Sequence, residues 1–143
     1  PLQKTKGELM VIECEDLQEK SITHGGVFMI PLGNNRYRVG STYNWKDQTE
    51  GTTTNARRSL QKKLYDIISV PYRMISQTAG FRPTTPDRRP VTGVHPEFPQ
   101  LAICNGMGSR GVLQAPFCTG LLCDHIEKGI PIPHEININR FEY

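Results

Sequence analysis

The sequence predicts an α+β fold: an antiparallel sheet with one covering helix, followed by two short strands and a second helix. Short alternating apolar segments, separated by turn residues, fill the N-terminal part of the chain. Residues 52–70 then change to apolar positions at helical spacing. The 13 glycines and 11 prolines among 143 residues indicate many turns.

The expected sheet begins with three strands. Residues 7–14 alternate loosely and are rich in strand-forming types, and residues 27–30 form a short apolar run that ends at Pro31. After the turn residues 32–35, the alternation of residues 36–41 predicts the partner strand of a hairpin.

A helix is expected over residues 53–70, capped by Thr53 or Thr54 and ending before Pro71. Its basic residues lie opposite the apolar ones, and we interpret them as the solvated face of an amphipathic helix. The apolar positions are Ala56, Leu60, Leu64, Ile67 and Ile68, and the basic ones are Arg57, Arg58, Lys62 and Lys63.

The second half of the chain is expected to alternate extended segments with turns. Extended segments are predicted at residues 72–82, 91–94 and 101–105, with a turn-rich stretch at 83–90. A helix follows residue 111 and is expected to stop near Gly129.

The loop Gly106-Met107-Gly108-Ser109-Arg110-Gly111 is the strongest candidate for a ligand site. A strand, a glycine-rich turn and a helix present backbone N–H groups to an anionic or electron-rich ligand, and glycines let the backbone approach a flat cofactor. The spacing fits G-x-G-x-x-G, but no βαβ unit or downstream acidic residue accompanies it. Taken alone, the loop is therefore either structural or ligand-binding.

Composition argues against several classes of protein. The net charge of +3 is scattered, so we do not expect a nucleic-acid partner. The four cysteines lack zinc-ligand spacing, and His95, His125 and His134 lack spacing for a metal or a triad, so no metal is expected. The chain has no signal peptide and no apolar run of membrane-spanning length, which predicts a cytoplasmic protein without a membrane partner.

Two longer blocks, residues 80–93 and 105–116, carry a family resemblance. The first reads G-F-R-P-T-T-P-D-R-R-P-V-T-G and the second N-G-M-G-S-R-G-V-L-Q-A-P. Together they resemble the C-terminal part of the D-amino-acid oxidase superfamily, which includes glycine oxidase, sarcosine oxidase and the oxidase domain of a tRNA-modifying enzyme. Residues 6–8 are similar to the start of the family's substrate domain, and residues 139–141 to its closing Arg-Phe.

The resemblance implies a domain division. Residues 1–80 are expected to form a substrate-binding domain, with its helix at about 53–70, and residues 81–143 to return to an FAD-binding domain. The family's segment that holds the ADP part of FAD lies at the N-terminus, and nothing before Gly7 could supply it. The expected fold is thus α+β, with the C-terminal strands and helix of an FAD-binding domain whose N-terminal half is absent. We expect FAD in the full-length parent and weak or no FAD binding by this chain alone.

The resemblance also implies site residues. Arg82 matches the arginine that pairs with the substrate carboxylate above the flavin, although a structural ion pair, for example with Asp87, is an alternative role. In the family a second arginine aligns with Ser109 and a tyrosine with Phe28, so Arg110 and Phe28 are the remaining substrate-binding candidates. The expected flavin-contacting residues are Gly106, Met107, Gly108, Ser109, Arg110, Gly111 and Val112.

The function implied for the parent is oxidation of the C–N bond of a small amino acid or secondary amine by hydride transfer to FAD. Such a reaction needs positioning more than acid–base help, so we nominate no catalytic residue, and Asp87 is interpreted as a turn residue rather than a general base. The alternatives are the flavin oxidase domain of a tRNA-modifying enzyme and a non-catalytic binding or structural module. Apolar surface left uncovered on the last helix predicts self-association.

Overall fold

The computed structural model describes residues 2–141 and divides into two compact units, each described here by itself. The sheet unit is Lys6–Phe81. The hairpin unit combines the N-terminal residues up to Thr5 with the chain from Arg82 onward. The predicted α+β class is confirmed, whereas the assignment of the two halves to substrate binding and flavin binding stays a prediction.

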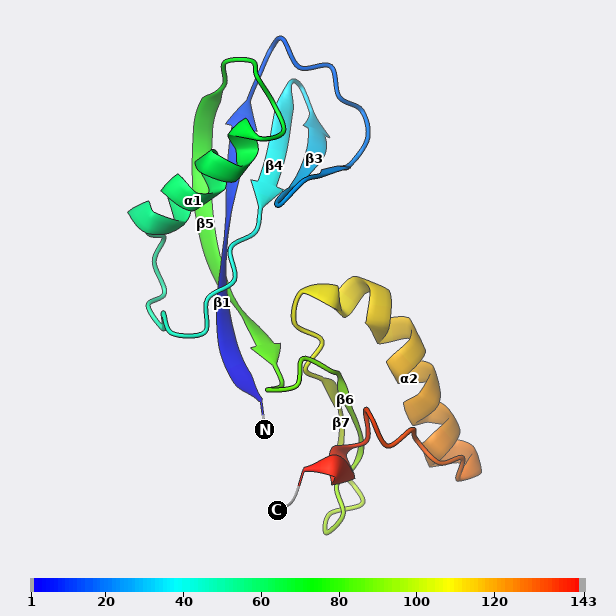
Figure 1. Ribbon diagram of the computed structural model, residues 1–143. Helices are drawn as coiled ribbons and strands as arrows, with labels where there is room; N and C mark the ends of the chain where they lie inside the picture. Colours follow the sequence, from blue (N-terminus) through cyan, green and yellow to red (C-terminus); the bar gives the residue numbers. More distant parts are fainter. Residues whose placement is uncertain (1, 142–143) are drawn as a thin grey trace. The chain divides into compact units, whose positions relative to one another are not determined.

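The sheet unit is built on a five-stranded sheet with the strand order β2-β3-β4-β1-β5 (Figure 1). The pairs β1–β4, β2–β3 and β3–β4 are antiparallel, and the sequence predicts the β3–β4 hairpin among them. Asn34 and Asn35 form the β3–β4 turn at φ values of 50° and 56°. The two-residue strand β2 is too short to leave a sequence pattern. The strands are β1 (Gln3–Glu13), β2 (Thr23–His24), β3 (Phe28–Gly33), β4 (Arg36–Gly40) and β5 (Arg73–Thr84).

Helix α1 (Thr54–Tyr65) packs against the sheet and closes the core (Figure 1). The predicted cap is Thr53, whose hydroxyl accepts a hydrogen bond from Ala56 N–H. The helix ends at Tyr65 instead of continuing to residue 70, yet Ile68 remains buried because a tight turn carries it back onto the core. The core consists of Met10, Ile12, Cys14, Val27, Met29, Tyr37, Val39, Leu60, Leu64 and Ile68.

A buried polar network ties β1 and β5 to the start of α1. The Glu8 carboxylate accepts hydrogen bonds from Thr53 N–H at 2.9 Å, from the Thr53 hydroxyl at 2.8 Å and from Gln77 Nε2 at 2.7 Å. Lys6, only 1% exposed, has its Nζ 3.8 Å from Glu8 and donates to Asp47 at 2.8 Å. Hydrogen bonds from Lys6 and from Thr49 hold the pKa of Asp47 at about 2. The network is therefore satisfied from within the unit.

The hairpin unit contains a two-stranded antiparallel sheet, β6 (Val91–Val94) with β7 (Ala102–Asn105), and helix α2 (Gly111–Lys128). Both strands and the stop of α2 at Gly129 agree with the sequence prediction. A short 3-10 helix, η1 (Gly108–Arg110), leads into α2, and a second, η2 (Ile138–Arg140), lies beside β6. Within residues 2–141, no helix combines the length and apolar character needed to cross a bilayer.

Replacing Glu8→Ala is expected to lower the free energy of unfolding of the sheet unit by about 3 kcal/mol, because the buried Lys6 ammonium loses one of its carboxylate neighbours. Trp45, the single tryptophan of the sequence, lies in this unit, so its fluorescence during urea unfolding measures the change. The exposed Glu50→Ala variant is the matched control and is expected to stay within about 0.5 kcal/mol of the wild type. Equal effects of the two variants would show that the buried network contributes no stability.

Candidate functional site

The two sequence blocks that carry the resemblance meet inside the hairpin unit. Thr84 and Met107 form an isolated antiparallel bridge, which we call the Thr84–Met107 junction. Thr84 is buried, and its hydroxyl lies 2.8 Å from that of Thr5. The Thr5 hydroxyl also donates to the main-chain carbonyl of Arg82 at 3.3 Å. The structure therefore fixes the backbone of Arg82 next to the glycine-rich loop.

Glycine is required where the loop passes these threonines. Gly106 has a φ of 76°, and a Cβ atom there would lie 2.9 Å from the Thr85 methyl group. Gly108 has a φ of 56°, and its Cβ would lie 3.4 Å from the Thr84 hydroxyl oxygen. Both positions thus need the left-handed backbone that glycine adopts without strain, and Gly106 also needs the missing side chain.

The glycine-rich loop is shorter than the sequence suggests. Residues 108–110 form η1, in which Arg110 N–H donates to the Met107 carbonyl at 3.0 Å. Gly111 has a φ of −54° and is the first residue of α2, so it belongs to the helix and not to the loop. The physical reason is that the Met107–Arg110 bond already turns the chain into helical geometry before Gly111.

The start of α2 follows directly on η1. No side chain caps it, and nothing lies within 4 Å of the position that a Cβ atom of Gly111 would take. The first N–H groups of a helix have no intrahelical acceptor and carry a partial positive charge. This arrangement can accept an electron-rich or anionic group. Of the predicted contact residues here, Ser109, Arg110 and Val112 are exposed and Met107 is half-buried.

Asp87 pairs with Arg140, and this pair bears on the interpretation of Asp87 as a turn residue rather than a general base. Its carboxylate oxygens lie 3.2 Å from Arg140 Nε and 3.3 Å from Arg140 Nη2, and Oδ1 accepts from Arg89 N–H at 3.2 Å. Burial raises the pKa of Asp87, but the hydrogen bonds from Arg140, the Arg89 N–H and Thr85 outweigh it and leave the pKa below its ordinary value. A carboxyl with a lowered pKa is a weak general base, which agrees with its interpretation as a turn residue.

The remaining candidates are spread over the chain. Arg82 is half-buried in the hairpin unit, and Arg110 is exposed at the start of α2. Phe28 belongs to the sheet unit, where its ring lies 3.1 Å from the place a Cβ atom of Gly40 would take. The structure thus brings the backbones of Arg82 and the glycine-rich loop together, while Phe28 lies in the other unit. The substrate and flavin roles of these residues stay predictions.

Sequence reasoning missed the residues that make the junction. Thr84 and Thr85 lie between Pro83 and Pro86, and this setting favours a turn interpretation. Both are instead fully buried. Two β-branched residues directly after a long extended segment were the available signal, because β-branched side chains favour packed strand positions. The hydroxyl pairing of Thr5 with Thr84 links residues 79 positions apart and leaves no local pattern.

The four cysteines differ in their burial. Cys14 and Cys118 are buried, as expected of small apolar residues, whereas Cys123 is exposed and Cys104 is partly buried. Burial raises the pKa of the Cys118 thiol, and the neighbouring Cys104 raises it further. Within the part of the chain that the structure describes, no group of three or more His, Cys, Asp or Glu side chains is arranged to hold a metal ion.

Comparison with known proteins gives consistent matches. The family model described as "FAD dependent oxidoreductase" matches residues 1–125. Glycine oxidase of Bacillus subtilis is 29% identical over 124 residues, which are 85% of this chain and 34% of that protein. The tRNA 5-methylaminomethyl-2-thiouridine biosynthesis bifunctional protein MnmC of Idiomarina loihiensis is 25% identical, with 99% of this chain and 25% of that protein covered. The chain therefore spans about a third or less of the curated relatives it matches.

Solved structures share the fold. Glycine oxidase from Bacillus cereus superposes with a TM-score of 0.75 at 22% identity, covering 91% of this chain and 37% of that one. L-proline dehydrogenase from P. horikoshii superposes with a TM-score of 0.74 at 17% identity, covering 92% of this chain and 37% of that one. At these identities the likeness is one of fold.

Replacing Gly106→Ala is expected to destabilise the hairpin unit by about 1–3 kcal/mol, because the new methyl group meets Thr85 and the left-handed backbone is strained. Gly120→Ala is the matched control: it lies inside α2 with nothing within 4 Å, and alanine is expected to stabilise the helix by about 0.5–1 kcal/mol. Thermal unfolding followed by circular dichroism measures both. A Gly106→Ala protein as stable as the wild type would contradict the close approach.

Proposed function

This chain belongs to the FAD-dependent oxidoreductase family, and from that premise we propose that it supplies the substrate side of an enzyme that oxidises the C–N bond of a small amino acid or secondary amine. The observation that carries the proposal is the Thr84–Met107 junction. It joins the segment of Arg82, a cation suited to a carboxylate, to a glycine-rich segment that ends in open space at Gly111.

The glycine-rich segment fits FAD by its backbone. Gly106 and Gly108 let the backbone pack closely against Thr85 and Thr84, and Gly111 leaves open space at the start of α2. The uncapped N–H groups there favour negative charge on a bound group. FAD, when bound, accepts the hydride that leaves the substrate carbon. The residues proposed to hold it are Gly106, Met107, Gly108, Ser109, Arg110, Gly111 and Val112.

Arg82 is proposed to bind and orient the substrate. A guanidinium fork can engage both oxygens of a carboxylate and thereby fix the neighbouring carbon. Thr5 and Thr84 hold the backbone of Arg82 in place, since both hydroxyls contact the Arg82 carbonyl, at 3.3 Å and 3.5 Å. Correct orientation can account for several kcal/mol of the reaction barrier, on the order of 7–11 kcal/mol in the best intramolecular cases. Arg110 and Phe28 are the further substrate-contact candidates.

Acid–base chemistry has a small part in this proposal. The paired Asp87 carboxylate remains ionised and engaged with Arg140, so it serves the loop and not the reaction. Phe28 has no hydroxyl, so any contact it makes with a substrate is one of packing. Substrate selection is accordingly proposed to depend on the cationic end at Arg82.

A second candidate function is the oxidase domain of a tRNA-modifying enzyme. The similarity to MnmC extends over 99% of this chain. The exposed basic residues of α1 could contact RNA phosphates without sequence preference. Activity that requires tRNA would favour this candidate over the oxidation of a free amino acid. The basic residues are Arg57, Arg58, Lys62 and Lys63.

The apolar face of α2 is proposed to drive association of this chain when it is isolated. Val112 is 98% exposed, and several other large apolar side chains on α2 and just after it are also exposed. Their exposure costs free energy that contact with a second copy recovers. The remaining members are Leu113, Phe117, Ile126 and Ile130.

Replacing Arg82→Ala in a longer product that includes the upstream coding sequence is expected to raise the apparent Kd for an amino acid about ten- to hundredfold, because a charge-assisted bidentate pair is lost. The measurement is the bleaching of the flavin absorption on anaerobic titration with the amino acid. The exposed Arg58→Ala variant of α1 controls for net charge and is expected to match the wild type. A product that stays colourless with added FAD would refute the flavin proposal, and an unaffected Arg82→Ala protein would refute the carboxylate role alone.

The isolated chain is expected to associate in solution, and the double variant Leu113→Lys with Phe117→Lys is expected to be monomeric because charges replace two exposed apolar side chains. Light scattering at several concentrations measures the mass. The control is Lys62→Ala with Lys63→Ala on α1, which removes two exposed charges without touching α2. A monodisperse wild-type monomer would contradict the proposal.

A further inference from the structure

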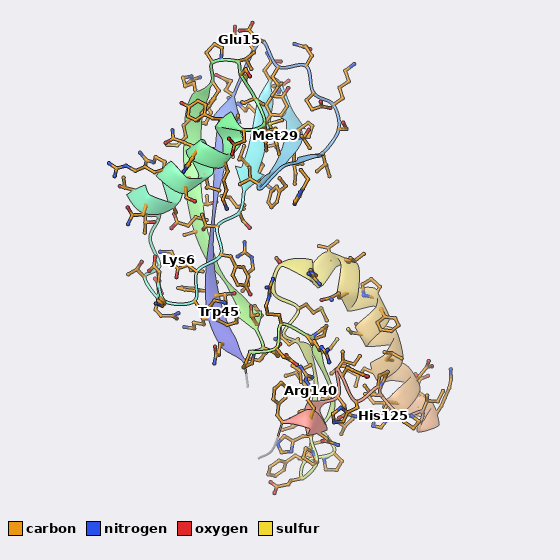
Figure 2. All side chains as sticks on the ribbon, viewed as in Figure 1. Lys6, Glu15, Met29, Trp45, His125 and Arg140 are labelled. Carbon is orange, nitrogen blue, oxygen red and sulfur yellow. The ribbon has the colours of Figure 1, made fainter. Side chains whose placement is uncertain are left out.

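Arg140 is a nearly buried guanidinium whose donors are almost all engaged. Its side chain is 7% exposed and forms the bidentate pair with Asp87. It also donates to the main-chain carbonyls of Arg89 and Asn137, each at 3.2 Å, and it lies 4.2 Å from the centre of the Phe141 ring. Figure 2 labels Arg140 at the short helix η2. So many fixed contacts indicate that Arg140 holds neighbouring segments together and is not a solvated surface charge. We call this set of contacts the Arg140 clasp.

The Arg140 clasp holds the Asp87–Arg89 turn, whose backbone is strained at Arg88. Arg88 has a φ of 60°, a left-handed backbone that a non-glycine residue rarely adopts. Its N–H donates to the Thr85 carbonyl at 3.0 Å, and the Thr85 hydroxyl donates to the Arg89 carbonyl that Arg140 also contacts. Such strain persists where surrounding contacts over-determine the conformation. Arg140 provides those contacts from a distant part of the sequence.

The turn is coupled to the glycine-rich loop through its first residue. The Thr85 methyl group sets the limit on Gly106, since a Cβ atom there would approach it to 2.9 Å. Next to it, Thr84 pairs with Met107 in the junction, and the Thr84 hydroxyl contacts the Arg82 carbonyl. A shift of the Asp87–Arg89 turn therefore moves the two threonines against which both candidate site segments are built.

We infer that Arg140 is a positioning residue: by clasping the Asp87–Arg89 turn it fixes Thr84 and Thr85, and through them the backbones of Arg82 and Gly106–Gly108. It touches neither substrate nor cofactor in this role. The part of the inference that concerns the reaction rests on the proposed function, whereas the coupling between turn and loop does not.

The first test is amide hydrogen exchange on this chain, which needs no cofactor. Arg140→Ala is expected to speed exchange about tenfold or more at the amides of residues 87–89 and also at those of residues 106–110, because both segments lose their support. The amides of α1 in the sheet unit are expected to be unchanged. Faster exchange at residues 87–89 alone, or at neither segment, overturns the inference.

Two further variants keep the test decisive if Arg140→Ala fails to fold. Arg140→Lys keeps the charge but loses the fork, and Asp87→Asn keeps the shape but loses the acceptor charge, so both are expected to reproduce the faster exchange at residues 106–110 more weakly. Lys128→Ala is the matched control, since it breaks an exposed 2.7 Å ion pair of the same unit at the end of α2. An effect of Lys128→Ala equal to that of Arg140→Lys overturns the inference.

The second test asks whether Arg140 positions Arg82 or only stabilises the fold. It uses the longer, flavin-containing product. Arg140→Lys is expected to raise KM for N-methylglycine about tenfold with a smaller change in kcat, and to change KM for dimethylamine, which lacks the carboxylate, less than about twofold. Equal losses for both substrates overturn the role at Arg82. If the wild type oxidises neither compound, the proposed function loses its support, while the exchange experiment still decides the coupling between turn and loop.

Discussion

The hairpin unit depends on one close approach, that of the Gly106 backbone to the Thr85 methyl group. Because no side chain fits between them, the loop can lie directly against the threonine pair, and the Thr84–Met107 bridge follows from that approach. The Arg82 carbonyl is anchored to the same pair through hydroxyl groups. A candidate site with few titratable groups is thus defined by backbone placement, which suits a reaction that depends on orientation.

Each unit contains charged groups that the protein itself neutralises. Glu8 and Lys6 are engaged with the start of α1 and with Asp47, and Asp87 is engaged with Arg140. A charge satisfied in this way is held in one conformation by several hydrogen bonds. Other groups are exposed to solvent, among them the basic residues of α1 and the apolar side chains of α2.

The sequence predicted the elements better than the site. Periodicity located α1, β6 and β7 to within a few residues, because each has a local pattern of apolar positions. It missed β2, which is two residues long, and it placed Gly111 in the loop because a glycine leaves no sign of its backbone angles. The site is assembled by contacts between distant parts of the chain, Thr5 with Thr84 and Asp87 with Arg140. No local sequence pattern could predict these contacts.

The span between Asp87 and its partner has a consequence for the order of synthesis. Residues 6–81 form a contiguous unit and can fold as they leave the ribosome. The Asp87–Arg89 turn must wait for Arg140, which is 53 positions later and emerges roughly 3–10 s afterwards at ordinary translation rates. During that interval the nascent chain carries a folded sheet unit and an incomplete hairpin unit, so chaperones that act on nascent chains would bind at the hairpin unit.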